Sequence, residues 1–95
     1  MSADVIPLAK FRLGRIVSTP QALDQLTEAD ILRAIGRHQA GDWGDVSEPD
    51  RRQNELALQQ GGRLWSVYHA DQHQKFWLIT ESTRDSTVVL LPEDY

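Results

Sequence analysis

The sequence predicts a single α+β domain, with two to three helices packed on a three- to four-stranded antiparallel sheet that ends in a C-terminal β-meander. Two observations lead to this prediction. The chain has 95 residues, which is enough for one hydrophobic core that folds without disulfides. The spacing of apolar residues changes from helical to strand-like after the Gly61-Gly62 pair. We therefore treat residues 1–95 as one domain.

The part of the chain before this glycine pair predicts a short strand and up to three helices. Ser18-Thr19-Pro20 supplies an N-cap with proline at the first helical position. Capping-box spacing recurs at residues 27–30 and 47–50, and Gly41 is a helix stop. The expected elements are a strand at residues 11–17 that is broken at Gly14, helices at 20–26 and 27–39, and a polar surface helix at 47–60.

The last part of the chain predicts three strands, at residues 64–69, 76–80 and 87–91, joined by polar turns of hairpin length. The last two strands are apolar at consecutive positions, so Phe76 and Trp77 point to opposite faces. A sheet with one face in water alternates apolar and polar residues. We therefore expect that helices cover both faces or that a partner chain covers one.

Charge and composition exclude several classes of protein. Ten basic and fourteen acidic side chains give a net charge of −4, which argues against a nucleic-acid partner because phosphate binding needs a positive surface. The chain contains no cysteine, so disulfides, thiolate chemistry and cysteine-bound metals are excluded. The apolar run in residues 1–10 is short and interrupted by Pro7, unlike a signal peptide. We expect a soluble cytoplasmic protein without a membrane partner.

The loop after the second helix combines two glycines with a tryptophan and two aspartates. We predict that Trp43 is buried at the junction of the second and third helices, with Gly41 or Gly44 at positive φ. The alternative is that the loop presents Asp42 and Asp45 to a partner.

Histidine side chains can bind a metal ion or take part in proton transfer. His38, Asp42 and Asp45 are one candidate cluster, but we favour a structural interpretation in which His38 caps the helix C-terminus and the aspartates cap turns. His69 and His73 are four residues apart but straddle a turn, so they lack the helical register of a zinc pair. We expect no metal and no cofactor.

Two segments stand out by their order of residues: Gly-Asp-Trp-Gly-Asp at residues 41–45 and the ending Leu-Leu-Pro-Glu-Asp-Tyr at residues 90–95. Together with shorter segments at 11–20, 37–39, 62–64 and 77–81, they resemble a family of small bacterial proteins carried on plasmids and other mobile elements. The resemblance implies a mobile-element setting but no catalytic residues and no mechanism.

The sequence favours a small non-enzymatic protein-interaction module of mobile-element origin. We also expect a homodimer. It would form through the sheet face or edge that carries residues such as Trp65, Trp77 or Val89. Pro92 ends the last strand, and Tyr95 is expected to fold back toward the basic start at Lys10, Arg12 or Arg15. The candidate interaction residues are Asp42, Trp43, Asp45, Trp65, Trp77 and Tyr95.

Two alternatives of other classes remain. A small toxin-type ribonuclease would use basic and histidine side chains on the sheet, but five acidic residues against three basic ones after residue 60 make this surface poorly suited to RNA. Its candidate groups are Arg63, Tyr68, His69, Lys75 and Arg84. An inhibitor of a host defence system is the second alternative, and it rests on the mobile-element setting alone.

Overall fold

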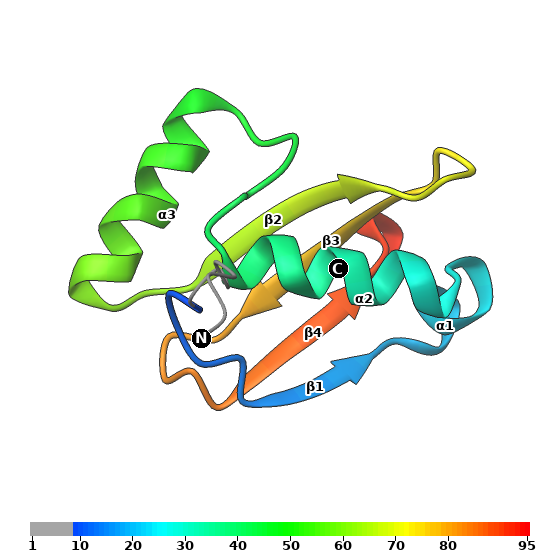
Figure 1. Ribbon diagram of the computed structural model, residues 1–95, viewed down its shortest axis with the longest axis horizontal. Helices are drawn as coiled ribbons and strands as arrows, with labels where there is room; N and C mark the ends of the chain where they lie inside the picture. The colour runs from blue at the N-terminus through cyan, green and yellow to red at the C-terminus, as the bar shows by residue number, and fades with distance from the viewer. Residues whose placement is uncertain (1–8) are drawn as a thin grey trace, which may run out of the picture.

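A computed structural model describes residues 9–95 and shows an α+β fold of helices and a four-stranded sheet (Figure 1). Residues 1–8, which include most of the segment judged unlike a signal peptide, lie outside the described part. Within that part, no helix is long and apolar enough to cross a membrane. The elements are β1 (Arg15–Ser18), α1 (Pro20–Gln25), α2 (Glu28–Gln39), α3 (Glu48–Gln60), β2 (Leu64–His69), β3 (Lys75–Thr80), β4 (Ser86–Leu90) and the 3₁₀ turn η1 (Pro92–Asp94).

The three helices begin at the residues that the capping patterns predict. The hydroxyls of Thr19, Thr27 and Ser47 each accept a hydrogen bond from a backbone N–H in the first turn. The first strand is shorter than expected, because Gly14 takes a φ of 65° and interrupts the extended chain. A Cβ at this position would lie 2.3 Å from the Asp85 backbone, so the turn also requires glycine for space.

The sheet has the strand order β1-β4-β3-β2. The pairs β2–β3 and β3–β4 are antiparallel, but β1 runs parallel to β4. The sheet is therefore mixed, and the prediction of an antiparallel sheet was wrong for its first strand. A parallel neighbour needs a long crossover connection, and the three helices between β1 and the remaining strands are part of that connection.

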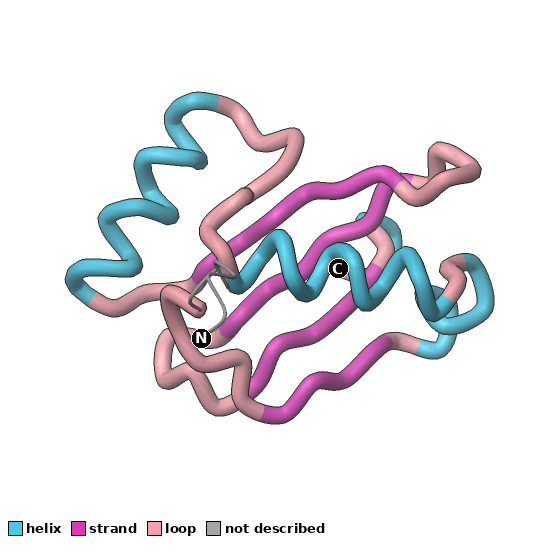
Figure 2. The backbone as a smooth tube through the Cα atoms, viewed as in Figure 1, coloured by secondary structure: helices cyan, strands magenta, loops and turns pink. Residues whose placement is uncertain are grey.

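The two faces of the sheet are covered differently. Helix α2 lies across one face, whereas α3 stands beside edge strand β2 (Figure 1). The loop between α2 and α3 returns along β2, as Figure 2 shows, and Gly44 forms a β-bridge with Val67. Side chains on the face under α2 are Leu64, Ser66, Tyr68, Phe76, Leu78, Thr80, Thr87 and Val89, all of them buried.

The opposite face carries no helix within residues 9–95, and we call it the helix-free face. Trp65, Val67, Trp77, Ile79, Val88 and Leu90 point to it, by the strand register and the alternation of side chains. Of the two arrangements expected for this sheet, helices on both faces are not found among the described residues; Tyr95 of the C-terminal segment packs on Trp77 of this face. Val89 is wrongly placed in the predicted dimer contact, because it is fully buried under the helices.

Candidate functional site

Trp43 is part of the scaffold. Its side chain is 3% exposed, its ring stacks on Phe11 and meets His38 edge-on, and its indole N–H donates to the Glu55 carboxylate of α3 at 2.8 Å. Gly44 has a φ of 76°, and a Cβ there would lie 2.0 Å from the Val67 carbonyl oxygen. The predicted burial of Trp43 between the second and third helices is confirmed, and a partner cannot contact this ring.

The two aspartates of the same loop have separate local side-chain partners. The Arg37 guanidinium donates to the Asp42 carboxylate at 2.7 and 3.2 Å, and this contact lowers the pKa of Asp42. The Asp45 carboxylate lies 3.1 Å from Nε2 of His69. Among the residues that the structure describes, no group of histidine and acidic side chains is arranged to hold a metal ion.

His38 was wrongly predicted to cap the helix C-terminus. Its side chain is fully buried between α2, to which it belongs, and the sheet. Nδ1 lies 2.5 Å from the Ser66 hydroxyl, and Nε2 lies 2.9 Å from the Thr80 hydroxyl. The Thr80 hydroxyl also bonds the Thr87 hydroxyl at 2.7 Å. Burial, followed by the charge of Arg84, lowers the pKa of His38 to about 4. The imidazole is therefore neutral near pH 7 and joins the helix to the sheet.

The side chains considered for a ribonuclease do not meet at one point. Tyr68 is buried, and its hydroxyl donates to the Asp42 carbonyl at 2.6 Å, with its pKa raised mainly by burial. The Arg84 guanidinium donates to the backbone carbonyls of Gly62 and Ala57, at 2.6 and 3.1 Å. Tyr68 and Arg84 are therefore both bonded within the fold.

Three of the candidate interaction residues meet on the helix-free face. The rings of Trp65 in β2 and Trp77 in β3 lie 5.2 Å apart at 83°, and Tyr95 packs against Trp77 at 5.6 Å and 66°. Both indoles are half-buried, whereas Tyr95 is 73% exposed. These rings form the aromatic cluster, a name we use for Trp65, Trp77 and Tyr95.

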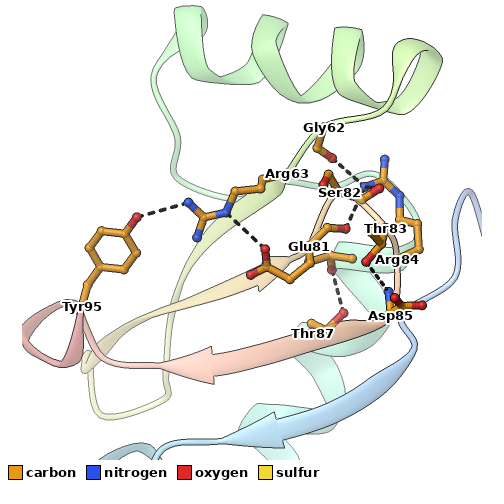
Figure 3. Close-up of polar contacts among 10 residues, drawn as sticks. Gly62, Arg63, Glu81, Ser82, Thr83, Arg84, Asp85, Thr87 and Tyr95 are labelled. Atoms are coloured by element: carbon orange, nitrogen blue, oxygen red, sulfur yellow. Dashed lines mark hydrogen bonds and ion pairs between the residues drawn. The ribbon is translucent and has the colours of Figure 1, made fainter.

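Arg63 lies beside the aromatic cluster and links it to the charged rim of the sheet. Its guanidinium donates to the Tyr95 hydroxyl at 3.2 Å and lies 3.9 Å from the Glu81 carboxylate (Figure 3). The C-terminus thus folds back as predicted, but onto Trp77 and Arg63 and not onto Lys10, Arg12 or Arg15.

The C-terminal turn holds this arrangement in place. The Asp94 carboxylate accepts hydrogen bonds from the Thr19 hydroxyl at 2.6 Å and from the Leu91 N–H at 3.0 Å. The anchored turn fixes where the last residue lies. Charge at the start of the chain therefore does not decide the position of Tyr95.

The aromatic cluster borders an open pocket of about 240 Å³, lined by Arg63, Trp65, Trp77, Ile79 and Tyr95. Within the described residues, Nε1 of Trp65 is buried without a hydrogen-bond partner. Tryptophan, tyrosine and arginine are the residues most enriched in the energetic centres of protein interfaces. Arg63 was not among the predicted interaction residues, although the i, i+2 spacing of Arg63 and Trp65 is the sequence signal that places both at one face.

The fold and this surface define a small α+β domain with one helix-covered face and one aromatic face. The chain matches no family model, no curated protein and no solved structure.

Proposed function

We propose that the protein is a non-enzymatic protein-interaction module and that its helix-free face is the contact surface. The observation that carries this proposal is the aromatic cluster around an open pocket beside Arg63. Indole and phenol rings give a large contact area at low entropic cost, and a guanidinium adds directional hydrogen bonds. A surface with this composition is suited to a protein partner.

The occupant that we propose is a second copy of the same chain. Arg63 and Glu81 lie together at the rim, and their separation of 3.9 Å is too long for a hydrogen bond. A twofold axis that passes between Arg63 and Glu81 would bring Arg63 of each copy to Glu81 of the other, so this part of the surface would be complementary to itself in charge. The two sheets would then stack about 10 Å apart, as in a β-sandwich.

Exposed apolar side chains extend the same surface beyond the pocket. Val17 in β1 is 37% exposed, and by register it lies beside Val88 of β4. Tyr95 adds a ring that is largely in water in the single chain. Stacking two such faces would remove these groups from water at about 25 cal/mol per Å² of apolar area.

The mass of the protein in solution tests this proposal. At micromolar concentration, sedimentation equilibrium should give twice the chain mass of 10.8 kDa. Trp77→Thr should give the single-chain mass, because it removes the central ring and keeps a residue that strands accept. Leu32→Thr is the matched control, since Leu32 is a 61% exposed apolar side chain on α2, away from this face, and its variant should stay dimeric.

Two results would contradict the proposal. One is a wild-type mass of 10.8 kDa across the concentration range. The other is a Trp77→Thr variant that remains dimeric, which would place any contact between copies elsewhere on the molecule.

A further inference from the structure

The two edges of the sheet differ in how their backbone groups are paired. At the β2 edge, the side-chain amide of Asn54 in α3 donates to the Trp65 carbonyl at 2.8 Å and accepts from the Trp65 N–H at 3.0 Å. The Val67 N–H donates to the Trp43 carbonyl at 3.0 Å, and the Asp45 N–H donates to the Val67 carbonyl at 2.8 Å. A helix side chain and a loop therefore take the place of a neighbouring strand.

The β1 edge has no such cover among the described residues. The N–H groups of Arg15 and Thr19 donate to carbonyls of the β4 side at 2.9 and 3.0 Å. Because ladder bonds recur at every second residue of a strand, the backbone N–H and C=O groups of Ile16 and Ser18 point away from β4. Within residues 9–95, no group bonds to them. An unpaired edge of this kind is a template for another strand.

The segment that contains β1 also differs from the rest of the chain in charge. Residues 9–18 carry Lys10, Arg12 and Arg15 and no acidic side chain, in a chain whose net charge is −4. None of these three cations forms an ion pair with another described residue. A strand that pairs with β1 therefore enters a positive environment.

We propose that the edge of β1 binds an extended acidic segment of another protein, which joins the four-stranded sheet as an additional strand. The outward backbone groups of Ile16 and Ser18 supply the hydrogen bonds and the register. Ile16 and Val17 point to opposite faces of the sheet and are 45% and 37% exposed, so neighbouring side chains of the added strand cover one on each face. Acidic side chains at the end of the added strand that lies beside the start of β1 pair with Arg12 and Arg15.

A second copy of this chain does not fit the same edge. Pairing β1 with β1 would bring two basic segments together, and like charges at close range oppose association. The edge contact also leaves the helix-free face available, so this inference does not depend on the dimer proposed above.

Binding of a peptide probe tests the edge. The probe is a blocked peptide Glu-Val-Thr-Val-Thr-Val-Glu, titrated at low salt into isotope-labelled protein, and its control carries lysine in place of glutamate. The acidic peptide should shift the amide signals of Ile16 and Ser18 and slow their hydrogen exchange. It should bind about tenfold more tightly than the lysine peptide, and salt should weaken it.

Variants separate the edge from other contacts. Ile16→Pro removes one outward N–H at an edge position, where proline is tolerated. This variant should weaken binding of the acidic peptide about tenfold. Ile16→Thr keeps the N–H and serves as the matched control. Trp77→Thr should keep peptide binding, so failure of this inference can be told apart from failure of the dimer. Circular dichroism checks that the Ile16→Pro variant is folded. If that variant is unfolded, Ser18→Pro, which removes the other outward N–H, is used in its place.

Three outcomes would overturn the inference. The first is equal binding of the acidic and lysine peptides. The second is that the acidic peptide shifts the amide signal of His69 at the β2 edge but not those of Ile16 and Ser18. The third is a single-stranded oligonucleotide that binds at Arg12 and Arg15 more tightly than the acidic peptide, which would indicate phosphate recognition.

Discussion

The two faces of the sheet contain apolar side chains from the same strands but differ in how completely their groups are satisfied. Under α2, His38, Ser66 and Thr80 bond one another and are fully buried. On the helix-free face, Val67, Ile79 and Leu90 are also buried. Trp65 and Trp77 on that face stay half-buried, and Arg63 pairs only loosely with Glu81. We propose that the helix-covered face stabilises the fold and that the helix-free face is a contact surface. Substitutions on the two sides should therefore separate stability from association.

The largest expected effect is the loss of Trp43 on the helix-covered side. Trp43→Ala should lower the free energy of unfolding by about 3 to 5 kcal/mol, because it leaves a cavity against Leu64 and Ala57. Urea denaturation followed by circular dichroism measures this change. If the free energy of unfolding of Trp43→Ala lies within about 1 kcal/mol of the wild-type value, the helix-covered side is not the part that stabilises the fold.

Acid should lower the free energy of unfolding through His38, which lies on the helix-covered side. In the unfolded chain His38 takes up a proton near its ordinary pKa of 6.5, whereas the folded protein keeps it neutral down to about 4. The stability from this neutral, bonded state is therefore complete above pH 6.5 and is lost as the pH falls toward 4. The full difference is about 3 kcal/mol.

Urea denaturation at neutral pH and at about pH 4.5 measures this dependence. His38→Gln should flatten it, because the variant lacks the buried imidazole. Asp30 and Asp42 have lowered pKa values, so their contribution is lost only at pH values below 3.8. A wild-type stability that does not change over this range would show that the folded protein accepts a charged His38.

An intermediate effect is expected at the β2 edge, which supports Trp65. Asn54→Ala leaves the N–H and C=O of Trp65 without partners and should cost about 1 to 3 kcal/mol. Gln53→Ala, at an exposed neighbouring position of α3, should change stability by less than about 0.5 kcal/mol. If both variants unfold at the same urea concentration as wild type, the amide of Asn54 does not hold this edge.

The smallest effect on the single chain is expected on the helix-free face. Trp77→Thr should cost about 1 kcal/mol at concentrations where the protein is monomeric, since it removes ring contacts that are only half-buried. Thermal unfolding at low concentration measures this. A loss as large as that of Trp43→Ala would mean that the aromatic cluster is needed for folding.

The fold was largely predictable because its signals are local. Thr19, Thr27 and Ser47 mark the helix starts within a few residues of sequence, and short runs of aromatic and β-branched residues mark the last three strands. The parallel pairing of β1 with β4 was not predictable, since the partners are far apart in the chain. His38 was misassigned for the same reason, because its partners lie 28 and 42 residues away.

The candidate surface was predictable in part. Trp65, Trp77 and Tyr95 were chosen for their chemistry, and the sheet register brings them to one face. Val89 was misplaced because consecutive apolar residues do not reveal which of them the helices cover. Arg63 precedes the strand, and only the position of the C-terminal turn shows that it contacts Tyr95.

A charge exchange between two copies tests the central claim most directly. Arg63→Glu and Glu81→Arg each place like charges opposite one another in the proposed twofold dimer, so each variant alone should sediment at the chain mass of 10.8 kDa. An equimolar mixture restores both opposite-charge pairs and should sediment at twice that mass. Variants that each remain dimeric, or a mixture that stays monomeric beside a dimeric wild type, would contradict the contact between Arg63 and Glu81 across the helix-free faces.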